Sequence, residues 1–435
     1  MKYKIPSFFL TSSIIFILLV VYKSEFVWEG LRRSYYIYFY IIGIFAIIFS
    51  VITYFLNKKF NQILLITFLS TILSVYLFEY YISYLKVDKS IEENSKILKK
   101  KTGKDYDKRS RTKVFKDLKK EGNKVTLSFF PEYFVYKQNL DLLPLSGISN
   151  INTILCSDQG EHLIFKSDKY GFRNENSIWD EDEIDYLIVG DSFAQGFCVE
   201  DPKHISETIK KNTNKKVLNI AYGSNGPLLE FASINEYLPK KTHNVLWFYF
   251  EGNDLENLDM ELKNDILKKY LYQENFSQNL KKKQNKINKI IEYELKENLS
   301  IKNYFNKFLK LKNTRKFIKK TFSTTDQKKL DPKILENLFL ILKKTKKILS
   351  KETKFYFVYL PDFSRYDTQN HNFESIKIKN FIKQNNIELI DVHEEIFSNY
   401  QNPKTFFNFQ KSGHYNEAGY KVIAEKIIEI IEKNE

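Results

Sequence analysis

The sequence is poor in the residues that build metal centres and disulfide frameworks. Its 435 residues include two cysteines and six histidines. Two cysteines are too few for the framework of a small secreted domain, and the sequence leaves open whether Cys156 and Cys198 pair. The histidines do not cluster at the spacing of metal ligands, and no zinc-finger, P-loop or dinucleotide-binding pattern occurs. We therefore expect no metal, no cofactor and no nucleic-acid partner.

Acidic residues are also fewer than basic ones. The chain has 68 Lys and Arg against 53 Asp and Glu, which gives a formal net charge of +15. Such a surplus favours attraction to an acidic polymer or surface. An AT-rich genome produces the same enrichment in Lys, Asn, Ile and Phe, so the composition leaves both explanations open. The length allows two or three domains.

Long apolar runs are present, and all three lie near the N-terminus. Residues 5–22 and 34–56 carry no charged side chain, and residues 63–85 carry one, Glu79. Each run is long enough to cross a hydrocarbon core of ~30 Å as a helix. Tyrosines open the second run and close the third, as expected at membrane interfaces. We predict a membrane domain over residues 1–88 with three transmembrane helices and an interfacial Glu79.

The orientation of these spans is less clear from the charges. Lys2 and Lys4 before the first run favour an N-terminus inside the cell, which places the remainder of the chain outside after three spans. The lysines that follow the third run favour the opposite orientation. Long domains cross the membrane largely regardless of such charges, so we give the distal lysines less weight.

Beyond the membrane domain, a charged connector gives way to alternating strands and helices. For residues 89–180 we predict a charged stalk and a small adjoining region. Over residues 181–435 the alternation predicts an α/β fold, with a parallel sheet covered by helices on both faces. The expected strands are 185–190, 216–220, 245–250, 354–360 and 387–391, and the expected helices are about 202–212, 227–238, 373–385 and 416–433.

A Lys-rich insertion at about 254–330 interrupts this alternation. Ile287, Ile290, Ile291 and Leu295 would share one helix face, and we expect two or three helices near the mouth of the site. The insertion is either a solvated amphipathic cap or a basic surface that captures an acidic glycan or contacts anionic lipid.

Four short motifs carry the chemistry of the chain. They are GDSFAQG at 190–196, NIAYGSNGP at 219–227, EGND at 251–254 and GHYNEAGY at 413–420. The first three directly follow expected strands, and the carboxyl ends of parallel strands form the ligand-binding edge of such a sheet. A serine on a strand-to-helix turn exposes its hydroxyl beside the N–H groups of the helix. The pattern therefore predicts an acyl-transfer site.

The expected roles at this site follow from the side chains. Ser192 is the candidate nucleophile and His414 the general base that takes its proton. The backbone N–H of Gly223 and the side-chain amide of Asn253 are candidate oxyanion donors. Each motif alone has a simpler explanation, namely a turn, a helix cap or a surface residue. Their order on one strand framework favours the site.

The four motifs resemble those of the SGNH/GDSL hydrolases, a family named for these residue types. The resemblance covers roughly residues 180–435 and implies a three-layer α/β/α domain. It implies Ser192 as nucleophile, Gly223 and Asn253 as oxyanion residues and His414 as catalytic histidine, with the backbone of Ser224 as an alternative to Gly223. The segment SDKYGFRN at 167–174 resembles the stretch before the serine motif in membrane-linked bacterial members. Family members hydrolyse or transfer acyl esters, and many act on acetylated polysaccharides.

The sequence departs from the family beside the histidine. The family usually has an Asp two or three residues before it, where this chain has Ser412 and Lys411. That Asp orients the imidazole, and its removal can lower the rate by on the order of 10⁴. A Ser–His dyad can still work if a backbone carbonyl or another carboxylate holds the imidazole. Asp362, Asp367 and Asp391, each near an expected strand end, are candidate substitutes.

Two functions are consistent with these features. The first is a membrane-anchored serine esterase or acyltransferase acting on acyl esters, such as the O-acetyl groups of an envelope or exported polysaccharide. The second is a catalytically impaired SGNH-like domain that binds glycan or scaffolds a polysaccharide biosynthesis complex. The intact Ser, Asn and His favour the first, and the missing Asp favours the second. Work on surface polysaccharide also favours a bacterial inner-membrane protein whose large domain is extracytoplasmic.

Overall fold

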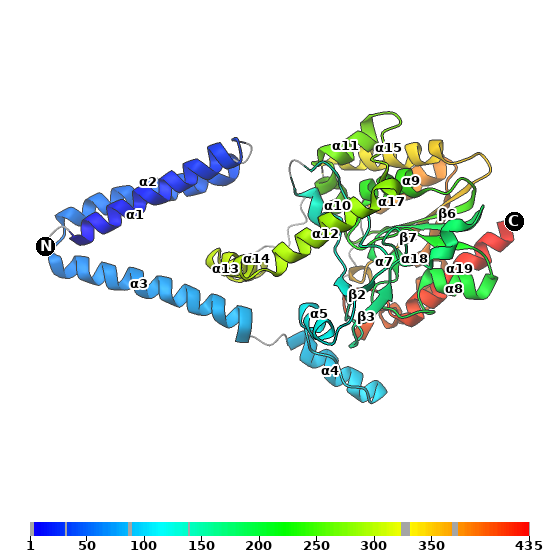
Figure 1. The fold of residues 1–435 in the computed structure, drawn as a ribbon, viewed down its shortest axis with the longest axis horizontal. Coiled ribbons are helices and arrows are strands. Elements are labelled where there is room, and N and C mark those ends of the chain that lie inside the picture. The colour runs from blue at the N-terminus through cyan, green and yellow to red at the C-terminus, as the bar shows by residue number, and fades with distance from the viewer. Residues whose placement is uncertain are drawn as a thin grey trace. The chain divides into compact units, whose positions relative to one another are not determined.

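The computed structural model describes residues 4–30, 33–85, 89–137, 140–322, 331–367 and 373–434 (Figure 1). The chain divides into two compact units. The helical unit comprises Met1–Lys86 and Tyr304–Thr325, and the sheet unit comprises Val87–Asn303 and Asp326–Glu435. The charged connector therefore lies in the same unit as the sheet, and part of the insertion belongs with the N-terminal helices.

The helical unit begins with α1 (Lys4–Val21), α2 (Arg33–Ile52) and α3 (Lys58–Tyr80). Three helices at these positions are long and apolar enough to cross a membrane, which confirms that part of the prediction. The α1 and α2 helices join through a hydrogen bond of 2.9 Å between the Ser13 and Ser50 hydroxyls. Gly43 lets them approach closely, because a Cβ there would lie 3.0 Å from Ile17.

The core of the sheet unit is a five-stranded parallel sheet in the order β5-β4-β6-β7-β8. Its strands are β4 (Ile184–Val189), β5 (Val217–Asn219), β6 (Thr242–Phe250), β7 (Lys354–Leu360) and β8 (Glu388–Asp391). All five expected strands are present, and the α/β prediction with a parallel sheet is confirmed. The order reverses between β4 and β6, and ligands of such sheets bind at the carboxyl ends of the strands beside this point.

Helices cover both faces of this sheet because its strands are apolar on both sides. Tyr186 and Ile188 of β4 point into one core, and Leu187 and Val189 point into the other. The helices α8 (Ile205–Thr213) and α19 (Glu417–Asn434) pack into the first core; α9 (Pro227–Tyr237), α15 (Pro332–Ile348) and α17 (Phe373–Gln384) pack into the second (Figure 1). The result is a three-layer arrangement around one sheet.

A second, smaller sheet precedes the parallel one. Strand β1 (Val125–Leu127) pairs in parallel with β2 (Asn152–Cys156), which pairs antiparallel with β3 (Leu163–Lys166). The helices α4 (Lys89–Thr102) and α5 (Arg111–Lys120) lie before it in the chain, and the one-turn helix α6 (Glu132–Val135) follows β1. The turn between β2 and β3 contributes to the site described below.

The insertion forms more helices than expected. Its described part contains five: α10 (Asp254–Glu261), α11 (Asp265–Tyr272), α12 (Gln284–Leu299), α13 (Ile301–Leu309) and α14 (Lys312–Phe322). The prediction of two or three helices was therefore wrong, and residues 323–330 at its end lie outside the described residues. As the spacing indicated, Ile287 and Ile291 of α12 are fully buried against the core. Two further one-turn helices are α16 (Ser364–Asp367) and α18 (Val392–Glu395).

Candidate active site

Ser192 opens the one-turn helix α7 (Ser192–Gln195) directly after β4. The turn between them requires Gly190, whose φ is +153° and where a Cβ would lie 2.7 Å from that of Ala194. Asp191 caps the helix, because its Oδ1 accepts a hydrogen bond of 2.8 Å from the N–H of Phe193. The local sequence therefore holds the serine at the carboxyl edge of the sheet.

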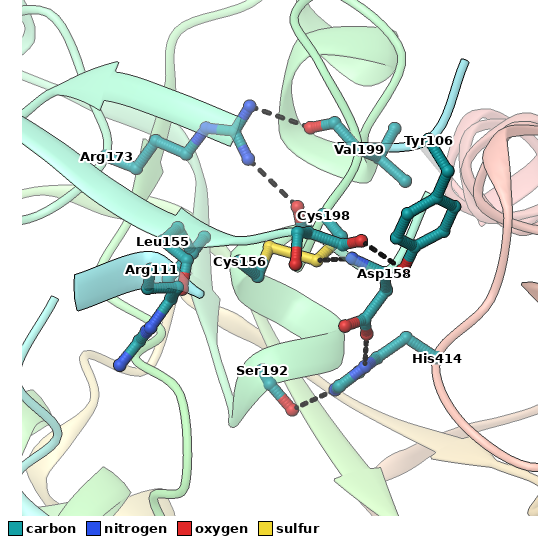
Figure 2. Close-up of a disulfide and its surroundings, with 12 residues drawn as sticks. Tyr106, Arg111, Leu155, Cys156, Asp158, Arg173, Ser192, Cys198, Val199 and His414 are labelled. Carbon is teal, nitrogen blue, oxygen red and sulfur yellow. Dashed lines mark hydrogen bonds and ion pairs between the residues drawn. A yellow bond between two sulfur atoms is a disulfide. The ribbon is translucent and has the colours of Figure 1, made fainter. Parts of the chain in front are cut away.

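His414 reaches this serine from the loop before α19. Its Nε2 lies 2.9 Å from the Ser192 Oγ. Figure 2 marks this contact with a dashed line. The imidazole packs between two rings of the serine segment, with centroids 4.9 Å from Phe193 and 4.4 Å from Phe197. The structure thus brings together the serine and the histidine that the motifs predicted.

The partner of the histidine is a residue that the sequence did not suggest. Asp158, in the turn between β2 and β3, lies with its Oδ2 2.9 Å from the His414 Nδ1 (Figure 2). A continuous chain of hydrogen bonds therefore runs from Asp158 through His414 to Ser192. Neutral imidazole satisfies both contacts if Nδ1–H donates to the carboxylate and Nε2 accepts from the hydroxyl.

The three aspartates proposed as substitutes have other partners, so that prediction was wrong. Asp362 accepts a hydrogen bond from the Ser364 hydroxyl at 2.5 Å. Asp367 pairs with Lys404, and Asp391 caps α18 and pairs with Lys379. The lysine before the histidine is also engaged elsewhere, since the Lys411 Nζ lies 2.9 Å from the Glu93 carboxylate of α4.

The two cysteines fix the aspartate turn to the serine segment. Cys156, at the end of β2, forms a disulfide with Cys198, and their Cα atoms are 5.5 Å apart. The backbone N–H of Asp158 donates to the Cys198 Sγ at 3.0 Å. From outside the sheet, Tyr106 donates its hydroxyl hydrogen bond to the Ser157 carbonyl at 3.0 Å. These contacts hold the Asp158 carboxylate next to the imidazole. The sequence left open whether the two cysteines pair, and assuming that they do would have pointed to Asp158 as the partner of the histidine.

The two predicted oxyanion residues differ in whether their polar groups already have a hydrogen-bond partner. The N–H of Gly223 donates to the side-chain oxygen of Gln195 at 3.0 Å, so a carbonyl oxygen would have to compete with Gln195 for it. Asn253 stands at the N-cap position of α10, but its side chain makes no capping hydrogen bond. Its Oδ1 is buried and has no hydrogen-bond partner among the described residues. The capping explanation for Asn253 therefore does not account for its side chain.

Behind the serine lies a group of buried carboxyls. Burial raises the pKa of Asp191 to about 6 and that of Glu261 to about 8. Burial, together with the charges of neighbouring carboxyls, also raises the pKa values of Glu230 and Asp254. Asp191 is the member next to the serine, and its Oδ2 is buried with no partner among the described residues. A protonated Oδ2 agrees with that environment.

We expect Asp191 to make the protein less stable as the pH rises. Its folded-state pKa of about 6 lies above its ordinary value of 3.8, so its neutral form is favoured by folding. The associated stability is fully present below the unfolded pKa and is lost as the pH rises through the folded pKa, by at most about 3 kcal/mol. Asp191→Asn keeps the oxygen that caps α7 and does not ionise. Thermal unfolding of the full chain in detergent should show a smaller loss between pH 4 and pH 7 in this variant; equal losses would contradict the assignment.

The chain is similar to known proteins in its structure alone. No family model and no curated protein matches the sequence. Among solved structures, the chain is similar to one from Desulfitobacterium hafniense that is described as lipolytic and of the G-D-S-L family. That alignment covers 57% of this chain and 98% of the other, with 12% sequence identity and a TM-score of 0.29.

Proposed function

We propose that the sheet unit is a serine hydrolase or acyltransferase of the SGNH type, with Ser192 as nucleophile, His414 as general base and Asp158 as the carboxylate that orients it. The hydrogen-bonded chain of these three residues carries the proposal. The absence of an Asp beside the histidine was the argument for an impaired glycan-binding or scaffold domain. Asp158, at 2.9 Å from the imidazole, supplies a carboxylate partner for the histidine and so supports the enzyme over that alternative.

The proposed reaction has two steps. As the Ser192 Oγ attacks the ester carbonyl, His414 Nε2 takes the hydroxyl proton, and Asp158 stabilises the resulting imidazolium. The imidazolium then donates that proton to the departing alcohol, which leaves an acyl-serine. Water or a sugar hydroxyl attacks this ester while His414 takes its proton, and the imidazolium then returns that proton to the departing Ser192 Oγ as the acyl group leaves as acid or as a new ester. The choice of acceptor distinguishes an esterase from an acyltransferase.

The oxyanion of both steps requires positioned donors. The N–H of Ser192 belongs to the first turn of α7, where backbone N–H groups have no partner within the helix. Asn253 follows β6, the strand next to β4, and its side-chain amide is the proposed second donor. Gly223 contributes a third donor if Gln195 releases its N–H.

Asn253→Ala should lower kcat for an aryl ester by ~10²–10³-fold with little change in KM. The reason is that the amide would stabilise charge that exists only in the transition state. Asn257→Ala is a suitable control, because Asn257 lies one turn further along α10. Equal kcat values for wild type and Asn253→Ala would remove Asn253 from the oxyanion site.

The proposed substrate is an acyl ester of an envelope or exported polysaccharide, handled outside the cytoplasm. Three apolar helices support membrane attachment. The Cys156–Cys198 disulfide supports the extracytoplasmic side, because disulfides persist in oxidising compartments. A reporter fused after residue 435 tests this orientation, and cytoplasmic reporter activity would overturn it.

Covalent labelling is the direct test of the proposed chemistry. The purified full chain should react with a serine-directed phosphonate, and Ser192→Ala should abolish the adduct. Ser398→Ala is the matched control, since this exposed hydroxyl donates only to the Glu394 carbonyl among the described contacts, and it should label as wild type does. Labelling that persists in Ser192→Ala, or its absence in the folded wild type, would refute the proposal.

A further inference from the structure

The end of the insertion carries a strongly basic pair of helices. Between residues 298 and 325 the sequence has eight Lys or Arg and no Asp or Glu. This stretch forms α13 and α14, which we call the basic hairpin (Ile301–Phe322). The unbroken positive charge distinguishes it from an ordinary solvated helix pair, in which both signs normally alternate along the surface.

The basic hairpin packs on the last turns of α3. Glu79 is fully buried, and its carboxylate accepts hydrogen bonds from the N–H of Asn313 at 3.1 Å and of Thr314 at 2.7 Å. The side chain that interrupts the third apolar run therefore caps the N-terminus of α14, where the helix dipole favours an anion. The Tyr76 hydroxyl also donates to the Leu309 carbonyl at 3.1 Å. These contacts fix the hairpin to a predicted transmembrane helix.

Ring contacts place the hairpin at the aromatic end of that helix. Tyr76 packs on Phe308 and Phe78 packs on Phe317, each with ring centroids 5.5 Å apart. The end of α3 is where the tyrosines of the third apolar run gather, and such tyrosines mark the level of the lipid headgroups. The hairpin therefore lies at the level of the membrane interface.

Large apolar side chains of the hairpin remain uncovered. In the part of the hairpin that belongs to the helical unit, Phe305 is 59% exposed and Ile318 is 49% exposed. Both helices are amphipathic, with apolar residues at helical spacing among the lysines. Apolar side chains beside a row of positive charges are the pattern of helices that lie in the plane of an anionic bilayer surface.

We propose that the basic hairpin is an in-plane membrane anchor that inserts its apolar side chains between lipids and binds anionic headgroups with its basic ones. The occupant of this surface is the anionic leaflet in which the last turns of α3 end. The inference stands apart from the chemistry at Ser192. It gives the insertion a role of its own, which is to tie the chain to the membrane at a point 201 or more residues after the last span.

A single labelled cysteine tests the anchor. Both native cysteines are in a disulfide, so Phe305→Cys adds the one free thiol for a fluorophore. In nanodiscs holding the full chain, a headgroup-quencher lipid should quench this label. Quenching by the anionic lipid should exceed that by the zwitterionic lipid by at least roughly twofold at equal mole fraction. The same label at Tyr272→Cys, an exposed position on α11 of the sheet unit, is the control. It measures how strongly the lipid quenchers act on a label outside the basic hairpin.

The charge variant Arg315→Gln/Lys316→Gln/Lys319→Gln should reduce the preference for the anionic quencher to near unity. Quenching of the Phe305 label by aqueous iodide, with no effect of lipid quenchers, would overturn the anchor. Equal quenching by both lipids would overturn the anionic preference. If a soluble polyuronate protects the label from iodide while lipid quenchers do nothing, the surface binds acidic glycan instead. Phosphonate labelling of Ser192 is read separately, so these outcomes are independent of the proposed function.

Discussion

Asp158→Asn is expected to lower kcat for ester turnover by on the order of 10⁴ with little change in KM. The substituted amide can donate its N–H to the imidazole Nδ1, which favours the tautomer whose Nε2 carries a proton and cannot accept the one from Ser192. The carboxylate now accepts from Nδ1 at 2.9 Å, so the substitution reverses the direction of that one bond without changing the size of the side chain. Steady-state kinetics with a short-chain aryl ester and an acetylated glycan measure the effect.

Two variants control this result. Asp367→Asn removes an exposed carboxylate that pairs with Lys404 and should keep kcat close to wild type. Ser412→Asp places an acid two residues before the histidine, as in the SGNH/GDSL hydrolases that the motifs resemble, and should change kcat by less than roughly tenfold, because Asp158 already orients the histidine. A wild-type rate in Asp158→Asn, or a large gain in Ser412→Asp, would mean that Asp158 is not the working partner.

The sheet was predictable because its signals are local. The run over 354–360 is apolar at nearly every position, as a strand buried on both faces requires, and β7 spans those residues. The glycine-framed Ser192 and the His414 motif could be located for the same reason, since a turn or a helix start depends on neighbouring residues. Strand order places Ser192 at the carboxyl edge of the sheet, whereas its contact with His414 depends on the loop before α19.

The orienting acid was not predictable in this way. Asp158 and His414 are 256 residues apart, and their contact depends on where a small second sheet docks. The candidate substitutes lie near expected strand ends, whereas Asp158 lies between β2 and β3, which were not among the expected strands. The two cysteines are the feature of the sequence that could have indicated Asp158. If Cys156 and Cys198 are assumed to pair, Asp158 comes close to the segment that follows Ser192.

The contacts of the insertion were not predictable for a related reason. Helical periodicity located the buried face of α12, but it does not say what an amphipathic helix packs on. Glu79 was expected to lie at the interface as a polar exception in an apolar run. Its role as a cap for Asn313 and Thr314 joins residues more than 230 positions apart, which no local pattern reports.

Ser192→Ala should lower kcat by roughly 10⁴- to 10⁶-fold, which would bring ester turnover to the level left by substrate binding and the oxyanion donors alone. No acyl-enzyme can form without the Oγ that lies 2.9 Å from His414. The decisive measurement is the double variant Ser192→Ala/Asp158→Asn. Three residues that act as one unit give non-additive losses, so this variant should be no slower than Ser192→Ala. If the two losses multiply instead, Asp158 contributes by a route that does not pass through the serine, and the proposed triad fails even though each residue is needed.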